Sequence, residues 1–235
     1  MNATLHYIYD PLCGWCYGAA PLVAAARTVL PVAAHAGGMM AGSSSQPVTP
    51  ALRNYVMPHD QRIAGMTGQS FGENYFNGLL QDSGAVFDSG PPIAAILAMQ
   101  ALDGRGLDML SAIQLAHYRD GKRIADVAVL RALAQDLNVN PEEFDRAYRH
   151  AENEELDQHI ADSRAFLNEV GGRGFPTFVL QRGDELSVLD AGRWLGRPDH
   201  WLEFLQMTIA ADRSAESSAQ NDDAAQCGID DKNCG

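Results

Sequence analysis

Two cysteines three residues apart, Cys13 and Cys16, have the spacing in this chain that most directly indicates chemistry. The apolar run Leu5–Tyr9 before them predicts a buried strand, and the Ala- and Leu-rich segment Pro21–Leu30 after them predicts a helix. A helix N-terminus offers unpaired N–H donors and a positive dipole end, which favour a thiolate. Cys13 is therefore the expected nucleophile, and Cys16, one turn later, is the thiol expected to resolve a mixed disulfide.

A zinc site is the alternative interpretation of this cysteine pair. Zinc would need two further ligands, and Cys227 and Cys234 near the other end of the chain are available. Their separation is longer than the two to four residues common in zinc ligand pairs. The spacing therefore favours redox chemistry over metal binding, and we expect no metal site.

Composition and charge narrow the classes of partner. The 235 residues include 17 Lys and Arg against 30 Asp and Glu, which gives a formal charge of −13. This balance offers no attraction for phosphate backbones or anionic lipids, so neither nucleic acid nor a membrane is an expected partner. The start of the sequence lacks the pattern of a signal peptide, and the apolar runs are too short to span a bilayer. We expect a cytoplasmic protein, a compartment in which cysteine pairs are more often redox-active or metal-binding than structural.

The remaining pattern places the cysteine pair in a larger architecture. Val32–Ala36 predicts a second strand, and the segment from about 48 to 170 has helical periodicity, with Asn140 as one helix cap. The period then returns to that of strands, with a hairpin over 176–189 and a last amphipathic helix from about Pro198 to Ala211. Residues 212–235 are polar and acidic with one Ile and no aromatic residue, which predicts a disordered tail.

A second motif far along the chain completes a resemblance. The segment Asp10–Gly18, a helical insertion and then Gly174-Phe175-Pro176-Thr177-Phe178 resemble the DsbA-like branch of the thioredoxin superfamily, within it the FrnE-type and predicted protein-disulfide isomerase group. The similarity covers about residues 4–210. It implies an α/β thioredoxin fold interrupted by a large all-helical domain. The implied division is a thioredoxin domain over 1–45 and 172–211, an insertion over 46–171, and a tail over 212–235.

The resemblance also implies roles for residues outside the cysteine pair. Pro176 would be the family's cis-proline facing Cys13, with the backbone of Phe175 pairing with an extended substrate peptide. Trp15 would lie partly exposed beside Cys13 and contact the substrate. Pro176, Phe175 and Trp15 are thus the expected substrate-positioning residues.

Three features depart from the family pattern. Gly14-Trp15 replaces the Pro-His or Pro-Trp pair found elsewhere in the branch, a position that tunes redox potential. Tyr7 occupies the place of a buried acid in DsbA, so this chain has no carboxyl group at that position to assist proton transfer. Cys13 stands where the related hydroxychromene-carboxylate isomerases and kappa-class glutathione transferases carry Ser, and a thiolate there suits disulfide exchange better.

The tail cysteines Cys227 and Cys234 match an additional C-terminal pair in FrnE-type relatives. This implies an auxiliary dithiol that exchanges with the active site; a passive tail disulfide or metal scavenging is the alternative.

Four methionines and one histidine receive structural interpretations. We interpret Met39, Met40, Met57 and Met66 mainly as core filling rather than as an adaptable binding surface, and His6 as a strand-packing residue.

Taken together, these observations predict a thiol-disulfide oxidoreductase or protein-disulfide isomerase that acts on protein disulfides through Cys13 and Cys16. The alternative is an enzyme similar to the hydroxychromene-carboxylate isomerases or the kappa-type glutathione-dependent enzymes. The redox-active cysteine pair needs no further cofactor, and glutathione is a candidate reductant. Expected partners are protein or peptide thiols and disulfides and a recycling partner of unknown identity; the direction of electron transfer stays open.

Overall fold

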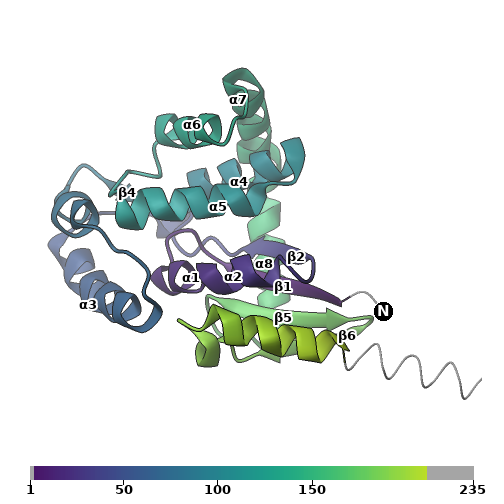
Figure 1. Ribbon diagram of the computed structural model, residues 1–235. Helices are drawn as coiled ribbons and strands as arrows, with labels where there is room; N and C mark the ends of the chain where they lie inside the picture. Colours follow the sequence, from purple (N-terminus) through teal and green to yellow (C-terminus); the bar gives the residue numbers. More distant parts are fainter. Residues whose placement is uncertain (1–2, 211–235) are drawn as a thin grey trace, which may run out of the picture.

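A mixed four-stranded sheet carries the cysteine pair in the computed structural model, which describes residues 3–210 (Figure 1). The strand order is β2 (Val32–Ala36), β1 (Ala3–Tyr9), β5 (Thr177–Arg182) and β6 (Glu185–Leu189). β1 runs parallel to β2 and antiparallel to β5, with Ile8 opposite Thr177. The end of β1 therefore meets the start of β5, and this places the Cys13 turn beside Pro176.

The two faces of the sheet are covered by different helices, because successive side chains of β1 point to opposite faces. Tyr7 and Tyr9 face α1 (Gly14–Gly18) and α2 (Ala20–Ala26), and Tyr7 stacks on Phe178 with ring centroids 4.9 Å apart. A helix over 198–210 closes this side, where the Trp201 indole donates a hydrogen bond to the Leu22 carbonyl at 3.1 Å. On the opposite face Ile8 packs against Leu167 of α8 (Leu156–Glu169).

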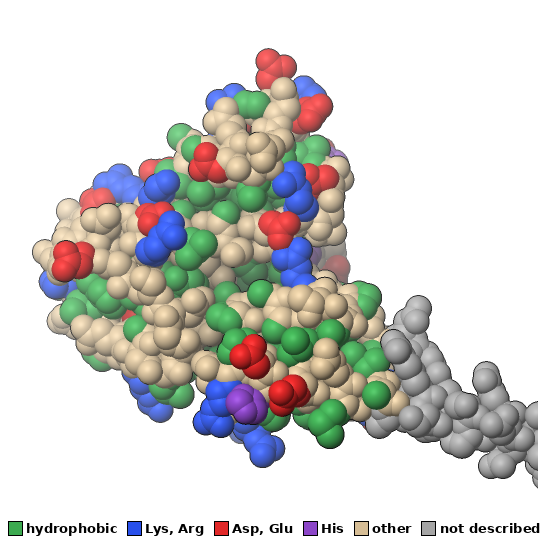
Figure 2. Space-filling model, viewed as in Figure 1, with side chains coloured by type: hydrophobic (Ala, Val, Ile, Leu, Met, Phe, Trp, Pro, Cys, Tyr) green, Lys and Arg blue, Asp and Glu red, His purple; other side chains and the backbone are tan. Residues whose placement is uncertain are grey.

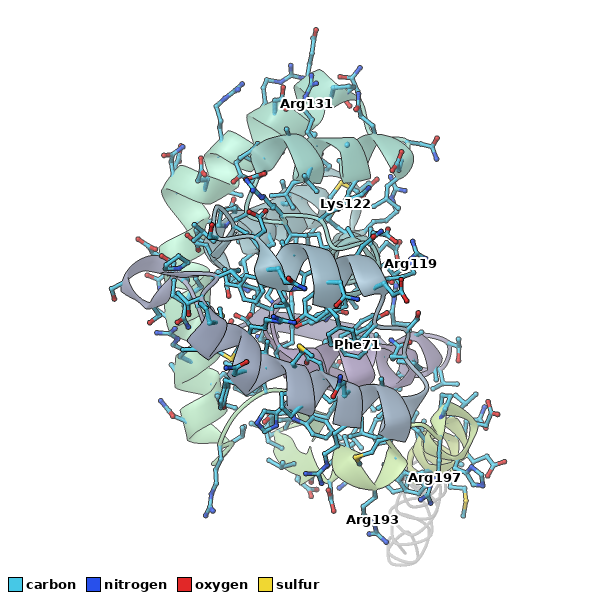
Figure 3. The ribbon with its side chains drawn as sticks, turned by 90° about the vertical axis from the view of Figure 1, so that its left-hand side faces the viewer. Phe71, Arg119, Lys122, Arg131, Arg193 and Arg197 are labelled. Atoms are coloured by element: carbon cyan, nitrogen blue, oxygen red, sulfur yellow. The ribbon has the colours of Figure 1, made fainter. Side chains whose placement is uncertain are left out.

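A block of helices between β2 and β5 lies beyond the edge of the sheet (Figure 1). Its main helices are α3 (Pro50–Thr67), α4 (Gly90–Asp103), α5 (Gly106–Gln114), α6 (Val127–Asp136) and α7 (Pro141–His150). Shorter segments connect them: η1 (Gly42–Ser44), β3 (Gln46–Pro47), η2 (Asn74–Gly78), η3 (Leu79–Gln81), β4 (Val86–Phe87), η4 (Leu115–Arg119) and η5 (Ala151–Glu155), while η6 (Ala191–Trp194) follows the hairpin. Figure 3 looks onto α3, which crosses in front of the first helices and is followed by Phe71.

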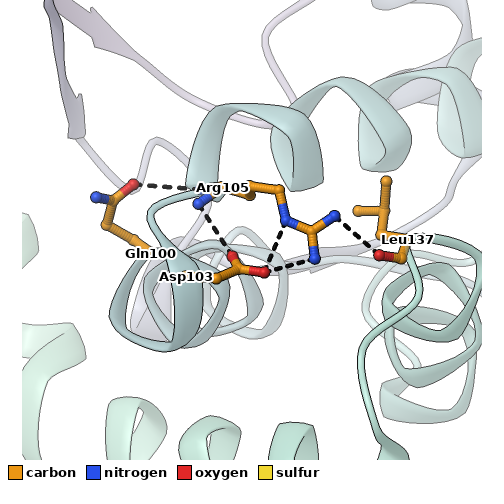
Figure 4. A network of polar contacts seen from close by, with 5 residues as sticks. Gln100, Asp103, Arg105 and Leu137 are labelled. Atoms are coloured by element: carbon orange, nitrogen blue, oxygen red, sulfur yellow. Dashed lines mark hydrogen bonds and ion pairs between the residues drawn. The ribbon is translucent and has the colours of Figure 1, made fainter.

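Local sequence signals explain several boundaries within this block. The Asn140 side chain accepts hydrogen bonds from the amides of Glu142 and Glu143, as expected of a helix cap. At the α4–α5 turn, Arg105 bonds Asp103 through Nε at 2.7 Å and reaches the Leu137 carbonyl beyond α6 at 2.9 Å (Figure 4). This network ties the α4–α5 corner to the end of α6.

Most expected elements are confirmed with small shifts in their boundaries. The first helical region is split into α1 and α2 and ends at Ala26 rather than Leu30. The β3–β4 pair was not predicted, because strands of two residues are too short to show a periodic pattern. The predicted domain boundaries stay predictions; α8 continues the helical block and also contacts β2.

The surface matches the acidic but mixed composition. Figure 2 shows acidic and basic side chains interspersed over one face of the molecule, with apolar groups between them. Within residues 3–210, no helix combines the length and the apolar character needed to span a bilayer. The predicted disordered tail, with Cys227 and Cys234, lies outside the described residues.

Candidate active site

Cys13 lies at the N-terminal end of α1, at the point where the turn after β1 becomes helical. Its backbone is extended, with φ −88° and ψ 112°, and its Sγ accepts a hydrogen bond from the Cys16 amide at 3.4 Å. Both thiols are free; Cys13 is 7% exposed and Cys16 is fully buried. The helix amide is thus directed at the sulfur whose thiolate it would stabilise, which agrees with Cys13 as the nucleophile.

The loop before β5 closes over Cys13 from the other side of the site. The Phe175–Pro176 peptide bond is cis, as the resemblance implies. Cys13 Sγ donates to the Phe175 carbonyl at 3.5 Å, although 162 positions separate the two residues in the chain. The Phe175 ring packs on Gly37, where any side chain would collide with it. The sheet register therefore brings together the two motifs that the resemblance paired.

Cys16 and Tyr7 form the buried layer beneath the nucleophile. Burial raises the pKa of Cys16 well above its usual value, and the neighbouring Cys13 adds to this effect. The Tyr7 hydroxyl donates to the Cys16 carbonyl at 3.3 Å, and burial also raises the Tyr7 pKa. Tyr7 therefore acts as a hydrogen-bond donor at the place where DsbA has an acid.

A groove of about 490 Å³ opens beside the cysteine pair, between α1 and α3. Its walls are mainly apolar and aromatic and come from the turn after β1, α3 and the helical block. The lining residues are Leu12, Cys13, Gly14, Trp15, Met39, Met40, Ser44, Gln46, Leu52, Tyr55, Val56, His59, Asp60, Ile63, Tyr75, Phe87 and Tyr118. A molecule that approaches Cys13 from this side would contact these apolar and aromatic walls.

Trp15 separates this groove from a smaller cavity of about 210 Å³ that Pro176 lines. The indole is half-buried, and the Arg62 guanidinium lies 5.9 Å from its ring centre. Trp15, Phe175 and Pro176 thus surround Cys13 on the sides from which a substrate could approach, and their roles in substrate positioning stay predictions.

The interpretation of the methionines as core filling is wrong for two of them. Met40 is buried, but Met39 is 42% exposed and Met66 is 46% exposed. Met39 and Met40 both line the groove. Met39 lies in the segment that follows β2, where its side chain is exposed, and residue type alone does not indicate this.

Asp60 of α3 is a groove residue that the sequence analysis missed. It is 4% exposed, and its Oδ2 accepts a hydrogen bond from the Tyr75 hydroxyl at 2.7 Å. Burial raises the pKa of Asp60 to about 6, an effect that the Tyr75 hydrogen bond partly opposes. The carboxylate lies against Gly14, where an added methyl group would collide with Oδ1. No local pattern on α3 marks this position, because the contact depends on the packing of α3 against α1.

Asp10 is a second buried acid that the sequence analysis treated only as the end of a strand. Its carboxylate accepts hydrogen bonds from the Leu12 amide at 2.8 Å, the Met39 amide at 2.5 Å and the Ser89 hydroxyl at 2.9 Å. Burial raises the Asp10 pKa, while these hydrogen bonds oppose the shift. Asp10 thus holds the turn before Cys13 in place.

His6 lies on the opposite face of β1 from the cysteine pair. It contacts His35 at 2.9 Å and Gln181 at 2.7 Å, and its ring packs at a tilt against Phe166 of α8. These contacts confirm its interpretation as a strand-packing residue.

Within residues 3–210, no group of three or more His, Cys, Asp or Glu side chains is arranged to hold a metal ion.

Comparisons with solved structures reveal close relatives. The cytosolic disulfide reductase DsbM from Pseudomonas aeruginosa is 55% identical, with a TM-score of 0.84 over 88% of this chain and 99% of that chain. A structure of DsbM with GSH gives 54% identity and a TM-score of 0.82 over the same shares. A candidate protein disulfide isomerase from Nitrosomonas europaea is 25% identical, with a TM-score of 0.73 over 90% of this chain and 99% of that one. A scan of protein-family models and a search of the curated proteins each find no match.

Proposed function

This chain belongs to the DsbA-like thiol-disulfide oxidoreductases of the thioredoxin superfamily, and we propose that it is a cytosolic reductase of protein disulfides that glutathione regenerates. The observation that carries the proposal is the position of Cys13 at the start of α1, with its Sγ between the Cys16 amide and the Phe175 carbonyl. The names of the relatives support the reductive direction and the compartment.

Reduction of a client disulfide proceeds in two exchanges. The Cys13 thiolate attacks one client sulfur, forms a mixed disulfide and releases the other client sulfur as a thiolate that takes up a proton. Cys16 then loses its proton and attacks Cys13 Sγ, which releases the second client thiolate and leaves the Cys13–Cys16 disulfide. Two electrons pass from the dithiol to the client. Burial keeps Cys16 protonated until the mixed disulfide forms, because its pKa is raised.

Regeneration reverses these exchanges with two molecules of glutathione. The first thiolate attacks the Cys13–Cys16 disulfide and forms a mixed disulfide with Cys13, and Cys16 leaves as a thiolate that takes up a proton. The second attacks the glutathione sulfur and gives oxidised glutathione and the Cys13 thiolate. Support comes from DsbM, which has been solved with GSH and matches this chain at 54% identity over 99% of the DsbM chain.

Client positioning is assigned to the residues around Cys13. The Phe175 carbonyl already accepts a hydrogen bond from Cys13 Sγ, so it lies within reach of a peptide bonded to that sulfur. Trp15 and Pro176 line the adjoining cavity and would contact the residues on either side of the client cysteine. Main-chain pairing of this kind accepts many sequences, which suits a reductase with varied clients.

Insulin reduction with glutathione as the electron donor tests the function. Cys13→Ser should abolish turnover, and Cys16→Ser should accumulate a mixed disulfide with Cys13 that mass spectrometry detects. Retained turnover in Cys13→Ser would contradict the proposal and favour the isomerase-like or kappa-type alternative.

The direction of transfer has its own test. Equilibration of the Cys13–Cys16 pair with glutathione buffers should give a reduction potential more negative than about −200 mV, in the range of reducing members of the superfamily. A potential near that of DsbA, about −120 mV, would assign the protein to oxidation instead.

Cys227 and Cys234 are proposed as an auxiliary dithiol that exchanges with Cys13. The pair lies outside the described residues, and its support is the family resemblance. The Cys227→Ser, Cys234→Ser double variant should slow reoxidation or reduction of the active site. Unchanged turnover and unchanged active-site exchange would show that the Cys227 and Cys234 pair has only a passive role.

A further inference from the structure

One carboxylate in the wall of the groove lacks half of its hydrogen-bond partners. Asp60 Oδ2 accepts the Tyr75 hydroxyl at 2.7 Å, but Oδ1 receives no donor among the described residues. The side chain is 4% exposed, and the part that remains open faces the groove beside Cys13. Oδ1 is not among the fully buried side-chain atoms that lack a partner, so its free acceptor positions are open to a donor from a molecule in the groove.

Among the described residues of the groove, no Lys or Arg balances Asp60, and His59 is the one histidine there. Among the described residues that line the groove, Asp60 is the single carboxylate, and no Lys or Arg lines the groove with it. Arg62, two positions along α3, lies over the Trp15 ring instead. A charge in an apolar wall is costly without a partner, so a ligand that supplies a cationic donor would gain from meeting it.

The site is built so that Asp60 reaches the nucleophile's own helix. Gly14 follows Cys13 directly, and a methyl group in its place would collide with Asp60 Oδ1 and come within 3.0 Å of Ile63 Cδ1. The missing side chain at position 14 therefore lets the carboxylate lie next to the residue that attacks the substrate. A group bound by Asp60 would belong to the molecule whose sulfur reacts with Cys13.

We propose that Asp60 binds a protonated amino group on the thiol or disulfide that exchanges with Cys13, so that the groove selects small thiols that carry an ammonium group. The inference rests on the proposed function and concerns the small thiol that reduces the Cys13–Cys16 disulfide. The apolar walls hold the rest of that thiol, and the carboxylate supplies the polar contact that sets its orientation. Asp60 is a binding residue and takes no part in electron transfer.

Glutathione and N-acetylglutathione provide the test, because they differ only in an ammonium group that acetylation makes neutral. The rate constant for reduction of the Cys13–Cys16 disulfide is measured with each thiol by quenching and alkylation. The wild-type protein should react about tenfold faster with glutathione, as expected for one charge-assisted hydrogen bond. Asp60→Asn keeps the shape and the Tyr75 contact, and it should slow the reaction with glutathione about tenfold while leaving N-acetylglutathione within about twofold.

Glu73→Gln is the matched control. It removes one negative charge from an exposed position two residues before Tyr75, so it reports any general effect of net charge. This variant should retain the wild-type preference for glutathione.

Three outcomes would overturn the inference. A wild-type protein that reacts equally with both thiols has no amino-group selection, and this result needs no variant. An Asp60→Asn variant that slows both thiols equally would show that Asp60 acts through Cys13 or the fold. An Asp60→Asn variant that leaves both rate constants unchanged would show that Asp60 does not bind either thiol. If neither thiol reduces wild-type protein that dithiothreitol does reduce, glutathione is not the reductant, and the proposed function fails instead.

Discussion

Two buried carboxylates flank the cysteine pair and differ in how completely they are hydrogen-bonded. Asp10, in the turn before Cys13, receives the Leu12 and Met39 amides and the Ser89 hydroxyl. Asp60, on α3, receives only the Tyr75 hydroxyl among the described residues. Both are nearly inaccessible, with 0% and 4% exposure, and burial raises the pKa of both. Burial therefore does not distinguish them, whereas hydrogen-bond satisfaction does.

The difference separates an acid that holds the fold from an acid that remains available to a ligand. Asp10 joins the turn after β1 to the residues that follow β2 and to the start of α4, so its three donors lose their acceptor if it is removed. Removal of Asp60 would leave only the Tyr75 hydroxyl without its acceptor and would also remove a buried charge. The first should matter for stability and the second for binding.

The largest expected effect concerns Asp10. Asp10→Ala leaves three buried donors unpaired and should lower the free energy of unfolding by about 3 kcal/mol or more. Asp60→Ala should cost about 1 kcal/mol or less, because loss of the Tyr75 hydrogen bond is offset by removal of a buried charge. Urea unfolding of both variants and of the wild type measures these two losses in the free energy of unfolding. Equal losses would mean that the two acids share one structural role.

A methyl group at position 14 should disturb Asp60 selectively. Gly14→Ala would press on Asp60 Oδ1 and Ile63, which should cost about 1–3 kcal/mol of stability and reduce the preference for glutathione. Gly65→Ala, on α3 with open space around it, is the matched control. It should stabilise the protein by about 0.5–1 kcal/mol and leave the preference intact. A Gly14→Ala protein with wild-type preference would show that the carboxylate does not need its contact with α1.

The contrast between the two acids also shows how far the sequence predicts this site. The β1–turn–α1 unit with Cys13 and Cys16 was predictable because its signals are local: an apolar run, two spaced cysteines and a helix-forming segment. The position of Pro176 opposite Cys13 came from the family resemblance, since the two lie in different parts of the chain and spacing alone does not connect them.

Asp10 and Asp60 could not be assigned for a different reason. Their environments are made by Ser89, Met39, Tyr75 and Gly14, which reach them only after the helical block has packed on the sheet. An aspartate in an exposed helix and an aspartate in a groove have the same local pattern. Hydrogen-bond satisfaction is a tertiary property, so sequence periodicity does not report it.

The pH dependence of stability should sharpen the role of Asp60. Its pKa is raised to about 6 in the folded protein, so between about pH 4 and 6 the folded state binds the extra proton and the unfolded state does not. The contribution of Asp60 to the free energy of unfolding is therefore most favourable below pH 4, and it falls by about 2 kcal/mol as the pH rises to about 6.

The difference in unfolding free energy between wild type and Asp60→Asn isolates this effect. The comparison cancels the opposite trend from His117, because both proteins contain this residue. Burial lowers the pKa of His117 to about 3, so the free energy of unfolding falls as the pH drops below about 6.5 and the unfolded state takes up a proton at this residue. The other titratable groups of the groove are Cys13, Tyr55, His59, Tyr75 and Tyr118. A difference that does not change between pH 4 and 7 would contradict the assigned ionisation of Asp60.

The smallest expected effect comes from the one hydrogen bond that Asp60 has. Tyr75→Phe removes the donor to Oδ2 and should cost about 1 kcal/mol of stability. Without that donor the ionised carboxylate is less favoured, so its pKa should rise further and the preference for glutathione should appear at a higher pH than in the wild type. Measuring the rates with glutathione and N-acetylglutathione from pH 5 to 8 in both proteins tests this shift. An unshifted profile would mean that Tyr75 fills space beside Asp60 without tuning its charge, whereas a shifted one would make the Asp60–Tyr75 pair the unit that sets when the groove accepts an ammonium group.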